Sequence, residues 1–388
     1  MLKNKDIICI SVSDWEKPWG SKQHLMKRLS ADNRVLYVEY QSSLFDFLLY
    51  PAYSFRKLFR YNRLHRISPG LSVYTPLPML PFGYYLACVT RINQFLLGLS
   101  LRVLMKRLGF VKPVLWSFTP SAVYLLGRLR FDKVIYHCGT DFLNEKNSYL
   151  RKRVVSRLEQ SFAKKAAIVL TLSRGLEERL KSLNSNTLYF PSAVDMEYFS
   201  AVRDDVNIKP KDLAPIKNPL IGLIGYLDGN VLDIALLRYI ARVRPQWSLV
   251  LIGPAFRGRD KLLSLRKYAN VHFLGEKSPD KVAVYLKYLD VCLIPYVRNS
   301  FTENVSPIKL YEYLAMGKPV VATYFSEDIR SYEKLVRVAS GQSQFENYIE
   351  DCLDHKANEQ EFNQRIKFAQ DNSWQRRLEF LSENPALS

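Results

Sequence analysis

Short runs of consecutive apolar residues recur along the chain and alternate with longer segments of mixed character. A run of this kind has the length of a β-strand that is buried on both faces, and the segments between the runs are long enough for helices. The alternation predicts an α/β fold built on mainly parallel sheets. The runs that we interpret as strands fall within residues 6–13, 35–39, 113–120, 133–138, 168–173, 189–195, 220–229, 248–254, 271–277, 289–296 and 320–322.

One polar, proline-bearing segment interrupts this pattern at residues 201–219. A chain of 388 residues is long enough for two domains, so we interpret this segment as the linker between them. The predicted organisation is an N-terminal domain over residues 1–200 and a C-terminal domain over residues 220–367. Residues 368–388 follow as a C-terminal segment.

Residues 299–323 predict a loop, a helix, a tight turn and a buried strand. Ser306 suits the N-cap and Pro307 the first helical position. Gly317 can end the helix in a left-handed conformation. The N-terminus of such a helix offers free N–H groups and the positive end of the helix dipole, which suits a phosphate group.

Two charged side chains follow on this helix. Lys309 lies in its first turn and Glu312 lies three residues further, so both can lie on one face. A lysine there can neutralise a diphosphate, and a carboxylate can accept hydrogen bonds from the two hydroxyl groups of a ribose. The spacing therefore predicts a nucleotide-diphosphate site. The alternative is an ordinary amphipathic helix with a surface ion pair.

The run Ser-Pro-x-Lys-Leu-x-Glu-Tyr-Leu-Ala-x-Gly-Lys-Pro-Val-Val-Ala at residues 306–322 resembles the donor-site helix of the GT-B glycosyltransferases of group 1. It is most similar to the subgroup that builds bacterial surface polysaccharides, such as teichuronic-acid glycosyltransferases. The resemblance implies two Rossmann-like domains that face a central cleft. It implies that the C-terminal domain binds a nucleotide sugar and the N-terminal domain binds the acceptor. It also implies that residues 368–388 form a terminal helix that returns to pack on the N-terminal domain.

The resemblance also implies a set of donor-binding residues. In the family, the glutamate at the Glu312 position binds the ribose, and a second glutamate eight residues earlier contacts the donor sugar. In this chain that earlier position is Asn304, which is a departure from the family. Relatives place an arginine and a lysine after the glycine turn near Gly225, and this chain has neither there. The implied donor side comprises Gly225, Glu276, Arg298, Asn304, Ser306, Pro307, Lys309 and Glu312.

The first domain supplies the implied acceptor side and the candidate base. Trp19, Gly20 and Gln23 lie in the loop after the first strand, and the resemblance implies that they border the acceptor; the alternative is a packed, solvent-shielding loop. The strand at 133–138 brings His137 and Asp141 to its carboxyl end, where α/β folds bind ligands. We expect Asp141 to be the base, with His137 second. The alternative is that Asp141 only caps a helix.

Charge is unevenly distributed along the chain, which carries a formal net charge of +19. Residues 41–130 hold twelve basic residues and one acid. Within residues 44–67 aromatic and basic side chains alternate, and as one helix they would form an interfacial surface for anionic lipid. The expected membrane patch consists of Arg56, Lys57, Arg60, Arg63 and Arg66, to which Arg102, Lys106 and Arg107 could add. The alternatives are a core segment with a solvated basic face, or a nucleic-acid site, which no motif supports.

Several kinds of chemistry have no signal in the sequence. There is no Asp-x-Asp motif for a metal-bound diphosphate, and His and Cys have no zinc-like spacing. The five cysteines are scattered, which favours a reduced, cytoplasmic protein. No signal peptide and no run of eighteen apolar residues is present. We therefore expect no metal and no cofactor.

The sequence thus predicts a metal-independent glycosyltransferase that uses a nucleotide-diphosphate sugar, with uridine as the favoured base. The acceptor is expected to be a lipid-linked glycan or a polysaccharide in cell-surface glycan synthesis, and the resemblance favours retention of configuration. The expected location is cytoplasmic and peripheral, on the inner face of the cell membrane, with no nucleic-acid partner. The alternatives are a GT-B nucleotide-sugar epimerase and a non-enzymatic, basic membrane-surface protein.

Overall fold

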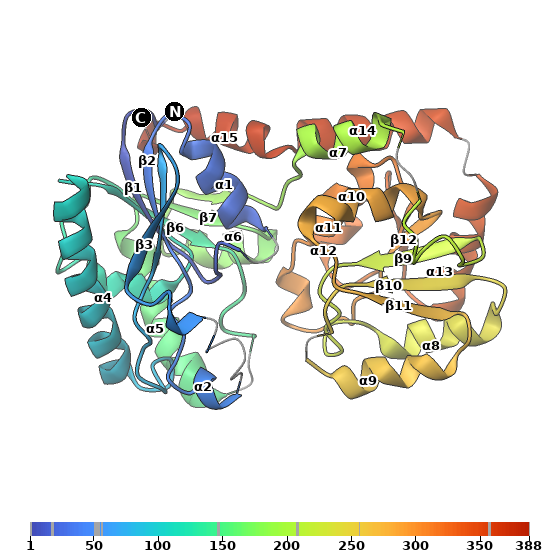
Figure 1. Ribbon diagram of the computed structural model, residues 1–388, viewed down its shortest axis with the longest axis horizontal. Helices are drawn as coiled ribbons and strands as arrows, with labels where there is room; N and C mark the ends of the chain where they lie inside the picture. Colours follow the sequence, from blue (N-terminus) through green and yellow to red (C-terminus); the bar gives the residue numbers. More distant parts are fainter. Residues whose placement is uncertain are drawn as a thin grey trace. The chain divides into compact units, whose positions relative to one another are not determined.

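The computed structural model describes residues 2–16, 19–49, 55, 57–145, 148–206, 209–255, 257–355 and 358–387 (Figure 1). The chain divides into two compact units. Unit 1 comprises Met1–Pro191 and Leu378–Ser388, and unit 2 comprises Ser192–Arg377. Residues 201–219, which the sequence analysis interprets as a linker, lie within unit 2, so the division falls earlier in the chain than expected.

The elements of unit 1 follow the alternating pattern of apolar runs. Its strands are β1 (Asp6–Ile10), β2 (Arg34–Val38), β3 (Arg63–Ser68), β4 (Leu71–Thr75), β5 (Val114–Ser117), β6 (Val134–Cys138), β7 (Ile168–Thr171) and β8 (Thr187–Tyr189). Its helices are α1 (Ser21–Leu29), α2 (Asp46–Leu49), α4 (Ala87–Leu108), η1 (Pro120–Leu125), α5 (Tyr149–Lys165) and α6 (Arg174–Lys181), with η4 (Pro385–Leu387) near the end of the chain.

The sheet of unit 1 has the strand order β3-β4-β2-β1-β5-β6-β7-β8. All neighbouring pairs are parallel except β3 and β4, which are antiparallel. The order reverses between β1 and β5, and α/β sheets bind ligands at the carboxyl ends of the strands at such a point. Helices α4 and α5 pack on one face of this sheet and share its hydrophobic core (Figure 1).

Unit 2 continues the alternation. Its strands are β9 (Leu220–Ile224), β10 (Ser248–Ile252), β11 (Val271–Gly275), β12 (Val291–Ile294), β13 (Val320–Thr323) and β14 (Arg337–Ala339). Its helices are α7 (Met196–Asp204), α8 (Ile234–Val243), α9 (Arg259–Leu263), η2 (Ser264–Lys267), α10 (Pro279–Tyr288), η3 (Thr302–Asn304), α11 (Ile308–Ala315), α12 (Glu327–Arg330), α13 (Gln342–Asp354) and α14 (Glu359–Asp371). Helix α15 (Trp374–Ser382) spans the second boundary between the units.

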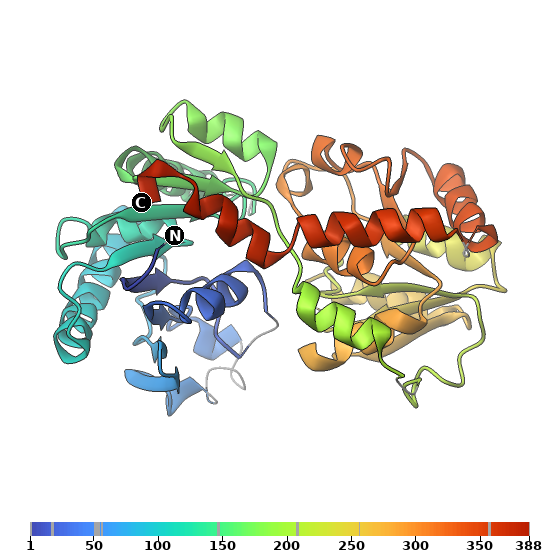
Figure 2. The ribbon, with the colours of Figure 1, turned by 90° about the horizontal axis from the view of Figure 1, so that it is seen from above.

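The described strands of unit 2 form a sheet in the order β11-β10-β9-β12-β13-β14, with every pair parallel. Helices cover both faces of this sheet, as the views in Figures 1 and 2 show. The strand order reverses between β9 and β12, which makes the carboxyl ends of these two strands the expected ligand-binding position in unit 2.

The prediction of one helix over residues 44–67 is wrong. Asp46–Leu49 forms the short helix α2, Phe55, Lys57 and Leu58 are also helical, and Arg63–Ser68 is the edge strand β3. Arg63 and Arg66 are exposed on this strand, but they are three residues apart and therefore point to opposite faces of the sheet. The expected basic face thus does not form, and Arg56 lies outside the described residues.

Two other members of the expected membrane patch point into unit 1. Lys57 is buried, and its ammonium donates a hydrogen bond to Asp14 Oδ1 at 2.5 Å. The half-buried guanidinium of Arg60 pairs with Glu16 and with the buried carboxylate of Glu39. These three acids lie in the loops after β1 and β2, before residues 41–130, which hold only one acid. Contacts in the folded unit therefore neutralise basic residues that have no acidic neighbour in the sequence.

Candidate functional site

Three adjacent strands of unit 2 end in glycines with left-handed backbone conformations. Gly225, Gly253 and Gly275 follow or end β9, β10 and β11, with φ angles of 131°, 139° and 70°. A Cβ atom on Gly253 would lie 1.9 Å from the carbonyl oxygen of Gly225, so a side chain cannot be placed there without moving the backbone. The turns after β9 and β10 therefore pack against each other more closely than a side chain would permit, and the backbone at these positions carries no side chain.

Lys309 lies directly over the first of these glycines. The side chain is buried, and a Cβ atom on Gly225 would lie 2.9 Å from Lys309 Nζ. The ammonium also lies 5.4 Å from the centre of the Tyr296 ring, and Tyr296 follows β12. The positive charge is thus held between the ends of β9 and β12, at the point where the strand order of unit 2 reverses.

Helix α11 is attached to the same strand end. The hydroxyl of Tyr313 accepts a hydrogen bond of 3.0 Å from the N–H of Ile224, the last residue of β9. The helix ends before Gly317, whose φ of 69° confirms the expected left-handed position. The hydrogen bond of Tyr313 thus holds the C-terminal half of α11 at the end of β9.

The expected capping role of Ser306 is wrong. Helix α11 begins at Ile308, with Pro307 at the N-cap and no side-chain cap. Instead, Ser306 Oγ accepts a hydrogen bond of 3.2 Å from the N–H of Ser192, and the Ser192 hydroxyl donates one of 2.8 Å to the carbonyl of Ser306. The serine thus fixes the loop before the helix. In the first turn, the N–H of Leu310 donates a hydrogen bond of 3.0 Å to the carbonyl of Pro307, and the N–H groups of Ile308 and Lys309 precede the regular hydrogen bonds of the helix.

Glu312 is half-buried, one turn along α11 from Lys309. Burial raises the pKa of its carboxyl group from about 4.5 to about 7, although the charge of Lys309 acts in the opposite direction. A carboxyl group with this pKa changes its charge near neutral pH. Such a strongly shifted group at the carboxyl edge of a sheet is characteristic of a functional site.

The structure places the remaining donor-side residues on the surrounding loops. Asn304 ends η3 and is half-buried. The exposed guanidinium of Arg298 pairs with Glu303 at 3.2 Å, so that charge already has an acidic neighbour. Glu276 is exposed after β11, and its charge adds to burial in raising the pKa of Tyr226, which places it near the residue after Gly225.

The sequence analysis missed one cation at this edge. Arg257 lies in the loop after β10 and pairs with Asp228, in the loop after β9, at 2.9 Å. Basic residues were expected only in the turn after β9. Because β9 and β10 are adjacent parallel strands, an arginine in the loop after β10 lies at the same edge of the sheet.

The corresponding edge of unit 1 holds His137 in an apolar environment. The ring is buried and lies 4.4 Å from the Phe118 ring, and its Nδ1 atom accepts a hydrogen bond of 3.4 Å from Trp116. Burial lowers the pKa of His137 to about 3, with a further contribution from the charge of Lys22. The imidazole is therefore neutral at physiological pH.

Asp141 is also buried, and its carboxylate organises the turn that follows β6. One oxygen accepts a 3.1 Å hydrogen bond from the N–H of Leu143, and the other accepts one of 2.8 Å from the side chain of Asn144. Arg179 lies 3.9 Å away as a partner of opposite charge. These contacts give Asp141 a structural role in the turn. It does not cap a helix, since α5 begins at Tyr149 with Ser148 as its N-cap.

The loop after β1 was expected either to border the acceptor or to pack against the domain, and its contacts are those of a packed loop. The buried side-chain amide of Gln23 donates hydrogen bonds to the carbonyl of Asp14 and to Ser13, and its oxygen accepts one from the N–H of Gly20. Gly20 is the N-cap of α1. Trp19 is half-buried, with its ring 5.2 Å from that of Trp15. Gln23 is buried and engaged in these bonds, whereas the side chain of Trp19 is partly exposed and available to a ligand.

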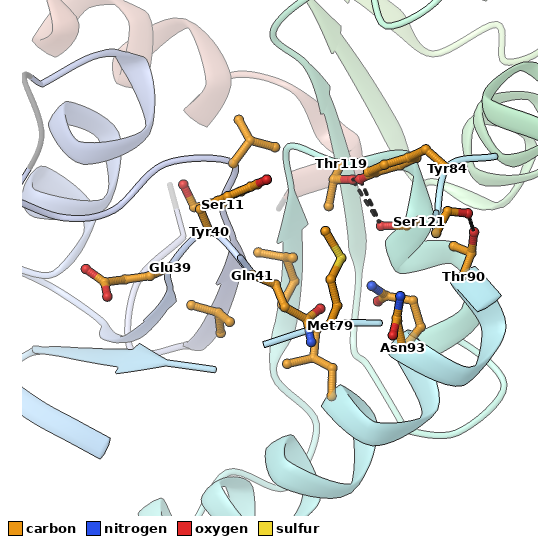
Figure 3. A pocket seen from close by; sticks show the side chains of 16 residues that line it. Ser11, Glu39, Tyr40, Gln41, Met79, Tyr84, Thr90, Asn93, Thr119 and Ser121 are labelled. Carbon is orange, nitrogen blue, oxygen red and sulfur yellow. Dashed lines mark hydrogen bonds between the residues drawn. The ribbon is translucent and has the colours of Figure 1, made fainter. Parts of the chain in front are cut away.

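A pocket lies at the carboxyl ends of β1, β2 and β5 in unit 1, where the strand order reverses (Figure 3). Its cavity volume is about 50 Å³, and it opens to solvent. Figure 3 shows Tyr84 pointing toward Thr119, whose hydroxyl lies 2.7 Å from that of Tyr84. The polar lining residues are Ser11, Glu39, Gln41, Tyr84, Thr90, Asn93, Gln94, Thr119 and Ser121.

One lining residue has an unused hydrogen-bonding atom. Gln94 is 5% exposed, and its Oε1 atom has no hydrogen-bond partner among the described residues. A buried acceptor without a donor is unfavourable, so this pocket is suited to a ligand that brings a hydroxyl or N–H group. Motif reasoning could not find the pocket, because its residues come from four separate segments of the chain.

No group of three His, Cys, Asp or Glu side chains within the described parts of the chain is arranged to hold a metal ion.

Comparisons with known proteins agree with the resemblance noted in the sequence. Residues 218–355 match the family model described as glycosyl transferases group 1. A curated relative, the putative teichuronic acid biosynthesis glycosyltransferase TuaH of Bacillus subtilis (strain 168), is 26% identical over 230 residues. The match spans 54% of this chain and 55% of the relative, which is about half the length of each protein.

Solved structures match over almost the whole chain. HepE from Anabaena in complex with UDP-glucose has a TM-score of 0.63 and 17% identity, covering 98% of this chain and 100% of that one. A UDP-forming α,α-trehalose-phosphate synthase from Burkholderia xenovorans in complex with glucose-6-phosphate has a TM-score of 0.71 and 10% identity, covering 98% and 99%. At these identities the likeness is one of fold. The chain thus has the GT-B fold, which confirms the predicted fold, and its residues 218–355 are similar to the glycosyl transferases of group 1.

Proposed function

We propose that this protein is a glycosyltransferase that transfers a sugar from a nucleotide-diphosphate sugar, with uridine as the base, to a lipid-linked or polysaccharide acceptor in the synthesis of a cell-surface glycan. The observation that carries the proposal is the arrangement of Lys309 and Glu312 on α11 beside Gly225. The relative from Bacillus subtilis, which is named for teichuronic acid biosynthesis, supports the acceptor class. The HepE structure, which contains UDP-glucose, supports the donor.

In this proposal, unit 2 stabilises the leaving diphosphate. As the bond to the sugar breaks, negative charge develops on the phosphate oxygens, and a fixed cation with aligned N–H groups lowers the energy of that state. Lys309 supplies the cation, and the N–H groups of the first turn of α11 supply the dipoles. We propose that these groups suffice without a metal. The retention of configuration that we favour is supported by the family resemblance alone.

Glu312 fixes the nucleoside end of the donor. Its carboxylate, one turn from Lys309, accepts hydrogen bonds from the ribose hydroxyls while the lysine faces the diphosphate. Glu276, on the loop after β11, is placed to contact the base, since it lies near Tyr226 at the same edge of the sheet. Together these residues would orient the donor along the ends of β9 and β11.

The acceptor binds to unit 1 in this proposal. The hydroxyl- and amide-lined pocket at β1, β2 and β5 suits the hydroxyl groups of a sugar, and the unpartnered Oε1 atom of Gln94 can accept a hydrogen bond from one of them. Trp19 offers a partly exposed ring on which a sugar ring can pack. Asp141 and His137 have structural surroundings, so we assign neither of them as the base.

The test is a calorimetric titration of nucleoside diphosphates and nucleotide sugars at pH 8, with and without EDTA, on the wild type and on Glu312→Ala. We expect uridine compounds to bind in both conditions and the variant to lose about 2 kcal/mol, or roughly 30-fold, in affinity. The matched control is Glu333→Ala, which removes an exposed carboxylate of the same unit and should bind as the wild type does.

If no nucleotide binds to the wild type, the proposal is wrong, and the non-enzymatic alternative is favoured. Equal affinity in Glu312→Ala and the wild type would remove Glu312 from the donor site. Turnover of a UDP-sugar to its epimer without an acceptor would favour the epimerase alternative instead.

A further inference from the structure

Helix α4 exposes a continuous apolar surface. Five residues at helical spacing lie on its outer side with exposed fractions between 41% and 68%. We call this surface the α4 face, and it consists of Ile92, Phe95, Leu96, Leu99 and Val103. A helix on the surface of a globular protein normally presents polar residues to solvent, so this pattern is the reverse of the usual one.

The inner side of α4 is correspondingly polar in its first half. Asn93 is buried, and its side chain exchanges two hydrogen bonds, of 2.8 and 3.0 Å, with the backbone of Leu80. Thr90 is buried and donates a hydrogen bond to the carbonyl of Gly83. The helix therefore cannot rotate to bury its apolar face without breaking these bonds, and the exposed face is a property of the fold.

The charges beside the α4 face all have one sign. Helix α4 contains no acidic residue, and its four basic residues are exposed. They are Arg91, Arg102, Lys106 and Arg107. An apolar stripe with a basic border is the surface that binds to anionic lipid, because the apolar side chains enter the boundary of the acyl chains while the cations meet the headgroups.

A basic groove adjoins this face between α4, η1 and α5. Arg91, Arg128 and Lys165 line it, and no acidic residue is part of its lining. The guanidinium of Arg128 lies 4.7 Å from the centre of the Phe95 ring, so the groove and the α4 face are in direct contact. A phosphate in the groove would therefore lie next to the apolar stripe, as the headgroup and acyl chains of one phospholipid require.

We propose that the α4 face docks on an anionic lipid surface, with the apolar side chains in the lipid boundary and a lipid phosphate in the groove of Arg91, Arg128 and Lys165. A second copy of the chain fits this surface less well, since two such faces would bring their basic borders together. Within the described residues, no helix has the length and apolarity to cross a bilayer. The predicted contact was centred on the basic residues of the segment 44–67, to which Arg102, Lys106 and Arg107 could add, whereas the proposed contact is centred on α4.

The first test is co-sedimentation of the full chain with vesicles of phosphatidylcholine alone or mixed with phosphatidylglycerol. We expect binding only to the mixed vesicles at low salt, and a loss of at least tenfold in Leu99→Asp. The matched control is Val206→Asp, which adds the same charge at a 96% exposed apolar residue of unit 2 and should bind as the wild type does. Equal binding by Leu99→Asp and the wild type would overturn the proposal.

The second test removes charge without adding any. The triple variant Arg91→Ala, Arg128→Ala, Lys165→Ala should bind mixed vesicles about a hundredfold more weakly, since each cation near an anionic surface contributes roughly a factor of five. The control triple Lys211→Ala, Lys281→Ala, Lys334→Ala loses the same charge from exposed positions of unit 2 and should bind at least tenfold more tightly than the groove triple. Equal loss in both triples, or a dimer in sedimentation equilibrium that Leu99→Asp dissociates, would contradict the proposal.

The two proposals can fail separately. The lipid test uses no nucleotide, and every variant can also be titrated with UDP. A variant that loses vesicle binding but keeps both its melting temperature and its UDP affinity supports the lipid proposal. A wild-type chain that binds mixed vesicles but no nucleotide retains the lipid proposal and removes the proposed function.

Discussion

The carboxyl edges of the two sheets differ in chemistry although their strand orders reverse in the same way. In unit 2, glycines with positive φ open the edge, and a buried lysine and a half-buried glutamate lie beside it. In unit 1, hydroxyl and amide groups line the edge, and its buried carboxylates, such as Asp141, are engaged in hydrogen bonds and ion pairs within the unit. The comparison suggests that unit 2 is adapted to a charged ligand and unit 1 to a neutral, hydroxyl-rich one.

The buried titratable groups at the two edges also respond to pH in opposite directions. Burial raises the pKa of Glu312 to about 7 and lowers that of His137 to about 3. Protonated Glu312 contributes to the free energy of unfolding below about pH 4.5, and this contribution is lost as the pH rises to about 7. Neutral His137 contributes to the free energy of unfolding above about pH 6.5, and this contribution is lost as the pH falls toward 3.

The largest expected effect concerns the lysine beside Gly225. Lys309→Ala should weaken UDP binding about a hundredfold, or by roughly 3 kcal/mol, because a desolvated charge pair with the diphosphate is lost. Calorimetry with UDP and with uridine separates the causes, since uridine has no phosphate and should bind both proteins equally. The control is Lys334→Ala, which removes an exposed lysine of the same unit.

An unchanged UDP affinity in Lys309→Ala would contradict the assignment of a charged ligand to unit 2. An equal loss for uridine and UDP would also do so, because it would show that the substitution alters the site as a whole rather than its contact with the phosphates.

The next effect is a pH dependence of donor binding. Below pH 7 the carboxyl group of Glu312 is mostly protonated and must lose its proton to accept hydrogen bonds from the ribose. The dissociation constant of a UDP-sugar should therefore fall about tenfold per unit as the pH rises toward 7, and should be constant above it. A UDP-sugar is the suitable probe, because its diphosphate has no proton to lose in this range.

The controls for this pH profile are two substitutions of glutamate by glutamine. Glu312→Gln should bind more weakly than the wild type above pH 7 and should show no dependence on pH. Glu333→Gln, at an exposed position of the same unit, should keep the wild-type profile. A slope that persists in Glu312→Gln would assign the titration to another group and refute this explanation.

The sequence predicted β1, β2, β5, β6, β7, β9, β10, β12 and β13 well, because each is a run of largely buried apolar residues. It missed β4 and β14, and the predicted run 189–195 meets β8 only at Tyr189. It did not predict β3, since an antiparallel edge strand with the pattern Arg-Leu-His-Arg-Ile-Ser exposes half of its residues and resembles a basic helix. The helix at 308–315 and its glycine terminus were also predictable, because the apolar spacing within one helix and the glycine that ends it are local properties.

Features that depend on distant contacts could not be predicted. Ser306 has the local signature of an N-cap, but its hydroxyl is engaged by Ser192, which is 114 residues away in sequence. Lys57 looks like a surface cation in an acid-poor segment, but Asp14 neutralises it from another loop. The Lys309–Glu312 pair was visible because it lies within one turn, whereas the pocket containing Gln94 required the assembled sheet.

The smallest expected effect tests the neutral edge in unit 1. Gln94→Leu removes the unpartnered Oε1 atom and should raise the free energy of unfolding by about 1 kcal/mol, because a buried acceptor without a donor is lost. If the acceptor uses that atom, sugar transfer from a labelled UDP-sugar to a membrane extract should fall severalfold while UDP affinity stays unchanged. Gln41→Leu, at a half-buried residue of the same pocket, separates loss of this atom from a general change in polarity. If Gln94→Leu is more stable than the wild type and transfers sugar equally well, the pocket does not take part in the reaction. If the variant is more stable but less active, the fold keeps an unpaired Oε1 atom for its ligand.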